Sequence, residues 1–259
     1  MPGDRSFRGP DLSLVMPCYN EEEVLGYTIP RLLGAFNRAG YVVELVAVDN
    51  GSKDQTGEII RRHAARDPQI VPVRVERNQG YGFGILTGID RCTGSWIGMV
   101  AADGQVDAED LVRLYEAVIA TNGRVLGKVR RRFRMDGFLR KIVSVAYNFY
   151  VRALWPGLQS IDVNGNPRIM RREVLEAMHL KSTNWLLDPE MMVKAYYLDV
   201  RVVELNVFAR MRSAGLSHVR AATCWEFFSS LLQHRFSSEW RREVGWIEIQ
   251  MPRARAVGE

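Results

Sequence analysis

The fold of this chain is best predicted from the stretch Trp96-Ile-Gly-Met-Val-Ala-Ala-Asp-Gly-Gln105. The apolar run from Trp96 to Ala102 has the length of a buried strand, and Asp103 follows at its carboxyl end. Open α/β sheets bind their ligands at such strand ends. Asp103 and Gln105 both carry ligand oxygens, and Gly104 permits a tight turn, so both could face one Mg2+ or Mn2+ ion. The structural alternative is a strand that ends in an Asx-type turn.

The same order of strand, polar turn and helix recurs through the first 121 residues. Strands are predicted at 12–17, 42–48, 71–75 and 96–102, and helices at 24–38, from 55 or 56 to about 66, from the glycines of 80–84 to 91, and at 108–121. This alternation predicts an α/β fold with a doubly wound, mainly parallel, Rossmann-like sheet. Polar side chains that follow three of the strands should meet in one crevice: Tyr19, Glu21, Asp49, Asn50, Asp103 and Gln105.

Composition limits the class of protein. A chain of 259 residues, 47% hydrophobic and 25% charged, can bury a large core as one domain, with or without a smaller appendage. The net charge of +5 fits an anionic partner such as a nucleotide, a phosphorylated substrate, a membrane surface or nucleic acid. The three cysteines lack metal-ligand spacing, which indicates free thiols in a reducing compartment.

Neither a secretory signal nor a membrane span is predicted. The most apolar helix-like segment, residues 142–151, has about half the length that a bilayer requires. We therefore expect a protein that is soluble or peripheral.

The glycines Gly80, Gly82 and Gly84 superficially resemble a dinucleotide fingerprint. The Rossmann motif follows the first strand, whereas these glycines follow the third, which argues against a nicotinamide cofactor. We expect a loop whose backbone approaches the ribose or diphosphate of a nucleotide. The alternative is a helix N-terminus that needs small residues.

Four motifs, in this order and spacing, resemble those of the family-2 inverting glycosyltransferases, which have the GT-A fold. They are Pro17-Cys-Tyr-Asn-Glu21, Val48-Asp-Asn-Gly-Ser-Lys-Asp54, Asn78-Gln-Gly-Tyr-Gly-Phe-Gly84 and Ala102-Asp-Gly-Gln105. Over roughly residues 11–220, the chain is most similar to the soluble dolichol- or polyprenyl-phosphate sugar synthases, such as dolichol-phosphate mannosyltransferase. The resemblance implies an inverting hexosyltransferase that moves a sugar from a GDP- or UDP-sugar to a polyprenyl or dolichyl phosphate.

The resemblance also implies roles for residues of the first half. Contacts to the nucleotide sugar would be made by Pro17, Tyr19, Glu21, Asp49, Gly80, Ala102 and Asp103. Mg2+ or Mn2+ on the donor diphosphate would be held by Asp103 and Gln105. The family commonly has Asp-Ala-Asp where this chain has Ala101-Ala102-Asp103, so the first carboxylate of the pair is absent. The ion would then depend on one carboxylate, one amide, the diphosphate and water.

The second half is expected to bind the acceptor. The basic cluster from Lys128 to Arg132 resembles the acceptor loop of the family, and Arg130 and Arg131 would bind phosphate; a solvated charged loop is the alternative. Arg212 and Ser217 lie in a segment that resembles the Arg-x-x-Gly-x-Ser element of the family, and they are expected phosphate contacts.

Asp188 and Glu190 lie in a segment that resembles the family's acidic segment next to the acceptor. If the acceptor is a hydroxyl, one of them would act as the base, whereas a polyprenyl phosphate needs none.

Two later segments have apolar stripes at helical spacing. In residues 138–154 the stripe is Ile142, Val145, Phe149 and Leu154, for which core packing and membrane contact are the alternatives. In the tail it is Trp225, Phe228, Leu232 and Phe236, which would dock on the domain, form a homodimer or contact a bilayer.

The expected organisation has four parts: a disordered leader, 1–10; a glycosyltransferase domain, 11–220, with a nucleotide-sugar half to 121 and an acceptor half from 122; an amphipathic region, 221–251; and a disordered tail, 252–259.

Three functions remain open. The first is a polyprenyl-phosphate glycosyltransferase, and the second is a related enzyme for a soluble hydroxyl acceptor in cell-surface polymer or natural-product assembly. The third is a sugar-nucleotide-binding protein without turnover, which the alanine at position 101 would suit. We expect a cytoplasmic location, with peripheral attachment to the cytoplasmic membrane face, and no nucleic-acid partner.

Overall fold

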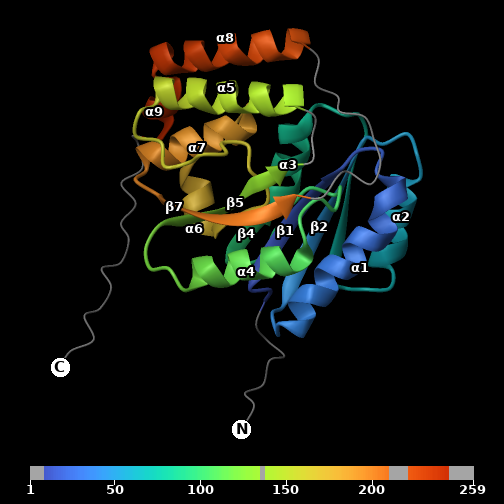
Figure 1. The fold of residues 1–259 in the computed structure, drawn as a ribbon. Helices are drawn as coiled ribbons and strands as arrows, with labels where there is room; N and C mark the ends of the chain where they lie inside the picture. The colour runs from blue at the N-terminus through green and yellow to red at the C-terminus, as the bar shows by residue number, and fades with distance from the viewer. Residues whose placement is uncertain (1–8, 135–137, 210–220, 245–259) are drawn as a thin grey trace, which may run out of the picture.

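The computed structural model describes residues 9–134, 138–209 and 221–244, and the side chains of these except 131–134, 138–143, 209 and 221–226. The strands form one seven-stranded sheet of order β3-β2-β1-β4-β6-β5-β7 (Figure 1). They are β1 (Leu12–Cys18), β2 (Val43–Asn50), β3 (Ile70–Val75), β4 (Trp96–Met99), β5 (Val125–Arg134), β6 (Arg168–Arg171) and β7 (Arg201–Ala209).

The sheet is mainly parallel. Strands β1 to β4 pair in parallel, and β5 pairs in parallel with β7. Strand β6 runs antiparallel to both of its neighbours, β4 and β5. The expected α/β fold with a mainly parallel sheet is therefore confirmed.

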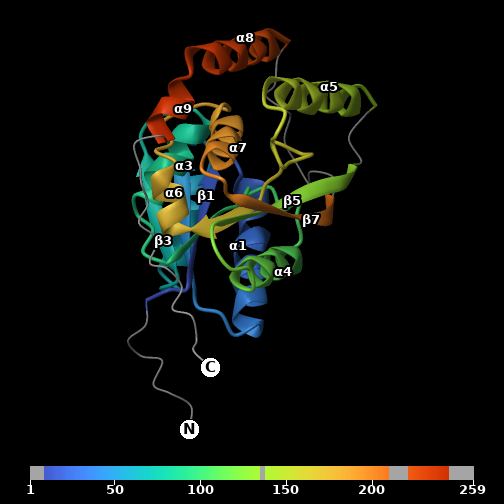
Figure 2. The same cartoon turned by 90° about the vertical axis from the view of Figure 1, so that its left-hand side faces the viewer.

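Helices cover both faces of the sheet. The helices are α1 (Glu22–Arg38), α2 (Thr56–Ala64), α3 (Tyr81–Ile89), α4 (Ala108–Ile119), α5 (Phe138–Leu154), α6 (Arg172–Ala177), α7 (Leu187–Tyr197), α8 (Ala221–Ser237) and α9 (Glu239–Val244). Helices α1 and α4 lie on one face, and α3, α6 and α7 lie on the other (Figure 2). Helix α2 lies on the face of α1 and α4, because its Ile60 belongs to the same core. Helices α5 and α8 lie next to each other at one end of the molecule (Figure 1).

Two hydrophobic cores lie on the two faces. Leu14 and Met16 of β1 pack in the core with α1 and α4, whereas Val15 between them packs in the core with α3, α6 and α7. All three side chains are fully buried. Because the sheet is covered on both faces, its central strands are continuous apolar runs, and this made them predictable.

Strand order places the crevice. Strand β1 lies between β2 and β4. After β1 the chain adds β2 and β3 on one side of β1, and it then adds β4 on the opposite side. Such a switch point opens a crevice at the carboxyl ends of the strands. The turns after β1, β2 and β4, which the sequence predicted to meet, follow three adjacent strands.

Two boundaries differ from prediction. Strand β4 ends at Met99 and not at Ala102; the amide of Val100 still donates to Val15 O at 2.9 Å before the chain turns. The basic cluster that begins at Lys128 was predicted to be a loop, and this is wrong, because the cluster lies within β5. Lys128 itself is fully buried.

The apolar stripes of α5 and α8 are turned outward only in part, because Leu154 and Phe228 are half-buried and pack against the core, as the core-packing alternative expects. The exposed members are Val145, Phe149, Leu232 and Phe236, at 63%, 76%, 43% and 77% exposure. The buried side chains of these helices are instead Tyr147, Val151 and Leu231. Core packing, one interpretation of the stripes, is therefore wrong for these four residues, while the side chains of Ile142 and Trp225 lie outside the described set.

The segment after α8 docks on the domain. Trp240 and Val244 of α9 are buried in the same core as α7. Among the described residues, no helix has the length and hydropathy to cross a bilayer.

Candidate active site

The turns after β1 and β2 are joined by hydrogen bonds between backbone and side chains. Asn20 Oδ1 accepts from the amide of Lys53 at 2.9 Å, and Thr56 Oγ1 accepts from the amide of Glu21 at 2.8 Å. The two segments thus form one wall of the crevice. Tyr19 and Glu21, both half-buried, lie in this wall.

Asp49 holds the turn after β2. Its side chain is almost completely buried; Oδ1 accepts from the amide of Ser52 at 2.9 Å, and Oδ2 accepts from Arg74 Nη1 at 2.8 Å. The carboxylate therefore fixes the turn beside the crevice. A contact between Asp49 and the nucleotide stays a prediction.

The glycines of residues 80–84 face protein backbone. A Cβ atom on Gly82 would lie 2.3 Å from Ser182 O, and one on Gly80 would lie 2.4 Å from Thr183 O. Gly80 also has a φ of +114°, which disfavours any side chain. The structure thus shows the structural alternative, a helix N-terminus that needs small residues, while the contact of Gly80 with a nucleotide stays a prediction.

Sequence reasoning missed an aromatic pair beside these glycines. The rings of Tyr81 and Trp185 are stacked, with centroids 4.5 Å apart and an interplanar angle of 11°. Asn166 Nδ2 donates to the hydroxyl of Tyr81 at 2.9 Å. These contacts connect the start of α3 to the segments before α7 and β6. The signal in the sequence was a tyrosine within the glycine motif, but its partner lies 104 residues away (185 − 81).

The turn after β4 carries the predicted metal ligands. Asp103 is 8% exposed, and its Oδ1 accepts from the amide of Gln105 at 3.1 Å. Gly104 between them has a φ of +64°. The Asx-type turn is therefore present, and it holds Asp103 and the half-buried Gln105 at one point of the crevice.

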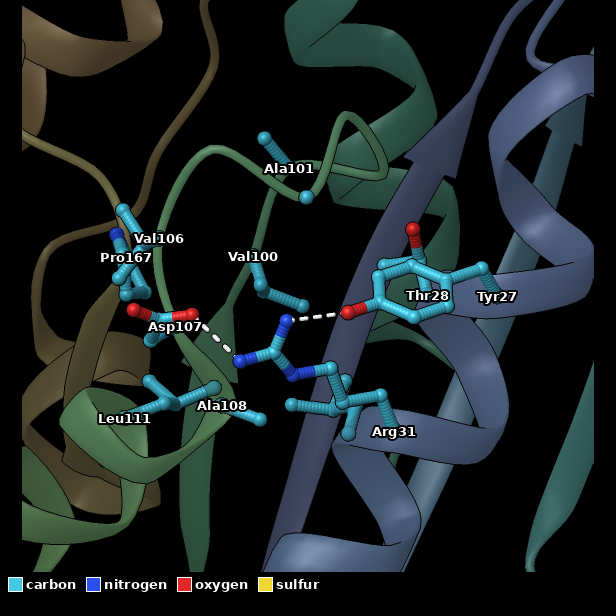
Figure 3. A pocket seen from close by; sticks show the side chains of 12 residues that line it. Tyr27, Thr28, Arg31, Val100, Ala101, Val106, Asp107, Ala108, Leu111 and Pro167 are labelled. Atoms are coloured by element: carbon cyan, nitrogen blue, oxygen red, sulfur yellow. Dashed lines mark hydrogen bonds and ion pairs between the residues drawn. The ribbon is translucent and has the colours of Figure 1, made fainter. Parts of the chain in front are cut away.

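A small pocket of about 30 Å³ lies between this turn and helices α1 and α4 (Figure 3). Arg31 extends across it, donating to the hydroxyl of Tyr27 and, at 2.6 Å, to Asp107 Oδ1. Ala101 is part of the wall. The position at which the family commonly has an additional aspartate therefore lines the same pocket as a guanidinium group.

The ligand oxygens of this turn suit a divalent ion only if a substrate supplies further ligands. Within the described residues, no three His, Cys, Asp or Glu side chains are grouped to hold a metal. One carboxylate and one amide, from Asp103 and Gln105, remain. Mg2+ sites commonly have one or two carboxylates, with substrate phosphates and water as the other ligands. The turn therefore suits an ion that a diphosphate helps to hold.

Asp188 is engaged in a buried ion pair. Its Oδ1 accepts from Arg168 Nη1 at 2.6 Å, and the two side chains are 9% and 1% exposed. Arg168 also donates to Val163 O at 2.7 Å and to Gly165 O at 3.1 Å. The pair fastens the segment before β6 to the first turn of α7.

Glu190 is completely buried. Its carboxylate accepts from the amides of Lys181 at 3.0 Å and Ser182 at 2.8 Å, and from Lys194 Nζ at 2.6 Å. Both oxygens are occupied, so in this arrangement Glu190 holds the loop that faces Gly80 and Gly82.

Sequence reasoning also missed the environment of Lys128. Its Nζ donates to Ser160 Oγ at 2.9 Å and to the carbonyl of Asp162, and it lies 3.7 Å from Glu204 Oε1. Burial, followed by repulsion from Arg168, lowers the pKa of Lys128 to about 7. The lysine thus supports the segment before β6 from inside the protein.

Of the predicted phosphate contacts, only one has a described side chain. Arg130 is half-buried and lies on the same face of β5 as Lys128, because side chains alternate along a strand. The side chain of Arg131 and the residues Arg212 and Ser217 lie outside the described part of the chain.

Comparison with known proteins identifies the family. The model of glycosyl transferase family 2 matches residues 13–178, which include all four motifs. The chain belongs to glycosyl transferase family 2. The resemblance found in the sequence is thereby confirmed, and the fold is the GT-A fold of this family.

Two curated relatives are about one-third identical to this family-2 chain over the part that aligns. Undecaprenyl-phosphate 4-deoxy-4-formamido-L-arabinose transferase of Pectobacterium carotovorum is 35% identical over 178 residues, which are 67% of this chain and 53% of the relative. Bactoprenol glucosyl transferase of Shigella phage SfX is 32% identical over 169 residues, which are 65% and 55%. The chain therefore spans about half the length of the curated relatives that it matches.

A solved structure supports the fold. Glucosyl-3-phosphoglycerate synthase from Mycobacterium tuberculosis, in complex with Mn2+, UDP-glucose and phosphoglyceric acid, matches with a TM-score of 0.70. The match covers 88% of this chain and 80% of the synthase, at 17% identity. At this identity the likeness shows a common fold.

Proposed function

We propose that this glycosyltransferase transfers a sugar, with inversion, from a nucleoside diphosphate sugar to a polyprenyl phosphate. The observation that carries the proposal is the 35% identity to a relative named as an undecaprenyl-phosphate transferase. A second relative is named as a bactoprenol transferase. The acceptor is therefore proposed from the relatives, and the part played by each residue is argued from the geometry of the crevice.

The donor would lie along the ends of β1, β2 and β4. Tyr19, Glu21 and Asp49 would contact the nucleoside, which is uridine or guanosine. Mg2+ or Mn2+ would be held by Asp103 and Gln105 together with the diphosphate, and such an ion neutralises charge on the leaving group. The structurally similar synthase binds Mn2+ with UDP-glucose, which supports this assignment.

The acceptor would need no general base. A phosphate monoester is ionised at neutral pH, so its oxygen can attack the anomeric carbon while the bond to the diphosphate breaks and its electrons pass to the diphosphate. This agrees with the engagement of Asp188 by Arg168 and of Glu190 by Lys194. A hydroxyl acceptor would require one of these carboxylates to leave its partner.

Helices α5 and α8 would contact the membrane that contains the acceptor. They expose the outer apolar face, which we define as Val145, Phe149, Leu232 and Phe236. Arg152 and Arg235 on the same helices are also exposed. Aromatic and aliphatic side chains flanked by arginine are typical of helices at a lipid interface. We therefore propose peripheral attachment to the cytoplasmic face of the membrane.

The test is a transfer assay on the purified protein. A panel of UDP- and GDP-sugars is incubated with Mn2+ and a short polyprenyl phosphate, and release of the nucleoside diphosphate is measured. We expect release that depends on the lipid phosphate. Asp103→Asn should lower the rate on the order of 100-fold or more, because it removes the charge that faces the leaving group. The control Asp90→Asn changes an exposed carboxylate at the end of α3 and should leave the rate unchanged.

Other outcomes separate the alternative functions. Release only with a hydroxyl acceptor would support the enzyme for a soluble acceptor. Donor binding without release for any acceptor would support a binding protein. If Asp103→Asn kept the rate of the unmodified protein while its thermal unfolding was unchanged, the proposed site would be wrong.

A further inference from the structure

A second cavity lies where helices α5, α7, α8 and α9 meet. Figure 1 shows α9 beside the ends of the other three helices. The cavity is an open groove of about 560 Å³, and its lining includes Leu154, Trp155, Tyr196, Tyr197, Arg235 and Arg241. Nothing in the proposed transfer reaction uses this groove.

The groove is separate from the crevice at the strand ends. Asp188 lies in the first turn of α7, whereas Tyr196 and Tyr197 lie in its last turn. Eight residues of α-helix span about 12 Å along the axis. The groove is therefore at the opposite end of α7 from the Asp188–Arg168 pair.

The charge of the groove is positive. Its lining contains two arginines and no carboxylate. Arg235 Nε donates to Leu154 O at 2.7 Å, which fixes the guanidinium at the rim and leaves its terminal nitrogens to bind other groups. Arg241 is exposed, and no carboxylate of the described residues lies within ion-pair distance of it.

The aromatic residues add a hydrogen-bond donor and a rigid wall. The hydroxyl of Tyr197 accepts from Trp155 Nε1 at 2.9 Å, so its own proton can be donated to an acceptor in the groove. The ring of Tyr196 packs over Gly157, where a Cβ atom would lie 2.5 Å from the ring. Tyr196 remains 42% exposed and forms part of the wall.

We propose that this groove binds a phosphate ester. The planar guanidinium group of arginine binds phosphate oxygens through paired hydrogen bonds, and two such groups suit a doubly charged anion. The phenol of Tyr197 supplies a further donor, and the rings of Trp155 and Tyr196 supply an apolar wall for the carbon part of the ester. The ester would be either a soluble metabolite or the headgroup of an anionic lipid. A lipid headgroup is one of the two sources because the groove opens beside the helices that bear the outer apolar face.

The experiment compares two neighbouring arginines in the full chain. Arg241→Gln removes a guanidinium of the groove. Arg242→Gln is the matched control, because Arg242 does not line the groove and donates instead to Ser237 O at 3.1 Å. Binding of glycerol 3-phosphate is measured by calorimetry, and binding to vesicles of phosphatidylcholine, with and without phosphatidylglycerol, is measured by sedimentation. Both residues are exposed, so both variants should unfold at the same temperature as the unmodified protein.

We expect Arg241→Gln to weaken binding at least tenfold and Arg242→Gln to leave it unchanged. Such a loss with glycerol 3-phosphate identifies a site for a soluble ester, and such a loss only with phosphatidylglycerol vesicles identifies a headgroup site. Asp103→Asn should bind the same probe as tightly as the unmodified protein, so failure of the transfer assay would not affect this result. Equal loss in the two arginine variants, or no binding of either probe, would overturn the proposal.

Discussion

Ala101 occupies the position where the family commonly has the first of two aspartates. It lies in the wall of the pocket crossed by Arg31, two residues before Asp103. Affinity for a divalent ion rises with the number of charged oxygen ligands, so the ion in this chain should depend strongly on the donor diphosphate.

Restoring the acid should strengthen metal binding. We expect Ala101→Asp to lower the Mn2+ concentration for half-saturation about tenfold, or about 1.4 kcal/mol, when UDP is present. A calorimetric titration with Mn2+ measures this. Ala101→Asn, which adds the same bulk without charge, should change the affinity much less. Unchanged or weaker binding in Ala101→Asp would contradict a metal site at this turn.

Lys128 should make stability depend on pH. The native lysine loses its proton near pH 7, whereas the unfolded one keeps it to about pH 10.4. Between these values the unfolded state binds more protons, so the free energy of unfolding should rise with pH, by at most about 1.4 kcal/mol per pH unit. Lys128→Met should lack this rise in urea unfolding at pH 7, 8 and 9.

The exposed Lys53 provides the control for this experiment. Lys53→Met should keep the dependence of the unmodified protein. An identical pH dependence in Lys128→Met and in the unmodified protein would show that Lys128 does not lose its proton in this range.

How well the sequence predicted the surroundings of a residue depends on how far its contact partners lie from it along the chain. Asp49 and Asp103 were placed correctly at the carboxyl ends of β2 and β4, the two strands that flank β1, because each lies at or just beyond the end of its own apolar strand. The partners of Lys128 and Asp188 were not predictable. Ser160 is 32 residues from Lys128, and Arg168 is 20 residues from Asp188, so these contacts depend on how β5, β6 and α7 pack.

Helix α3 begins at glycines against which the loop before α7 packs. We expect Gly82→Ala to lower the free energy of unfolding by about 1–3 kcal/mol, because its methyl group would meet the carbonyls of Ser182 and Asn184 at 2.3 and 2.8 Å. Urea denaturation measures this change.

A glycine within α1 gives the opposite expectation. Gly26 has open space around its Cα, so Gly26→Ala should raise stability by about 0.5–1 kcal/mol through helix propensity. If Gly82→Ala were no more destabilising than Gly26→Ala, the loop would not be packed on α3 as described.

Strands β1 and β2 were predictable because both of their faces are apolar, whereas β5 was not. Its charged residues broke the pattern of a buried strand, and only the buried partners of Lys128 make that charge tolerable. The stripe in α5 was located correctly, but the sequence left its orientation open: Val145 and Phe149 are exposed, whereas Leu154 packs against the core. Periodicity shows that a helix has an apolar face, but it does not show whether protein or solvent covers that face.

The arrangement of α5 and α8 at one end of the protein predicts how the molecule attaches to lipid (Figure 1). The double substitution Phe149→Ser with Phe236→Ser should reduce vesicle binding by at least about tenfold, because burying one phenylalanine contributes about 1.5–3 kcal/mol. Both side chains are more than three-quarters exposed, so thermal unfolding should not change. Co-sedimentation with phosphatidylglycerol vesicles measures the effect.

Ile119 at the end of α4 provides the comparison, because it is exposed on a helix that covers the other face of the sheet. Ile119→Ser should bind vesicles like the unmodified protein. Equal losses in the two variants would mean that attachment has no preferred side.

The hydrogen bonds that join the turns after β1 and β2 bear on how fast a donor can bind. Amides of one turn are already held by side chains of the other, so this part of the cleft is ordered without a ligand. A ligand that meets a ready-made surface loses little affinity to ordering of the chain. Donor association should then follow a single exponential whose rate constant increases linearly with concentration, without a plateau from slow rearrangement.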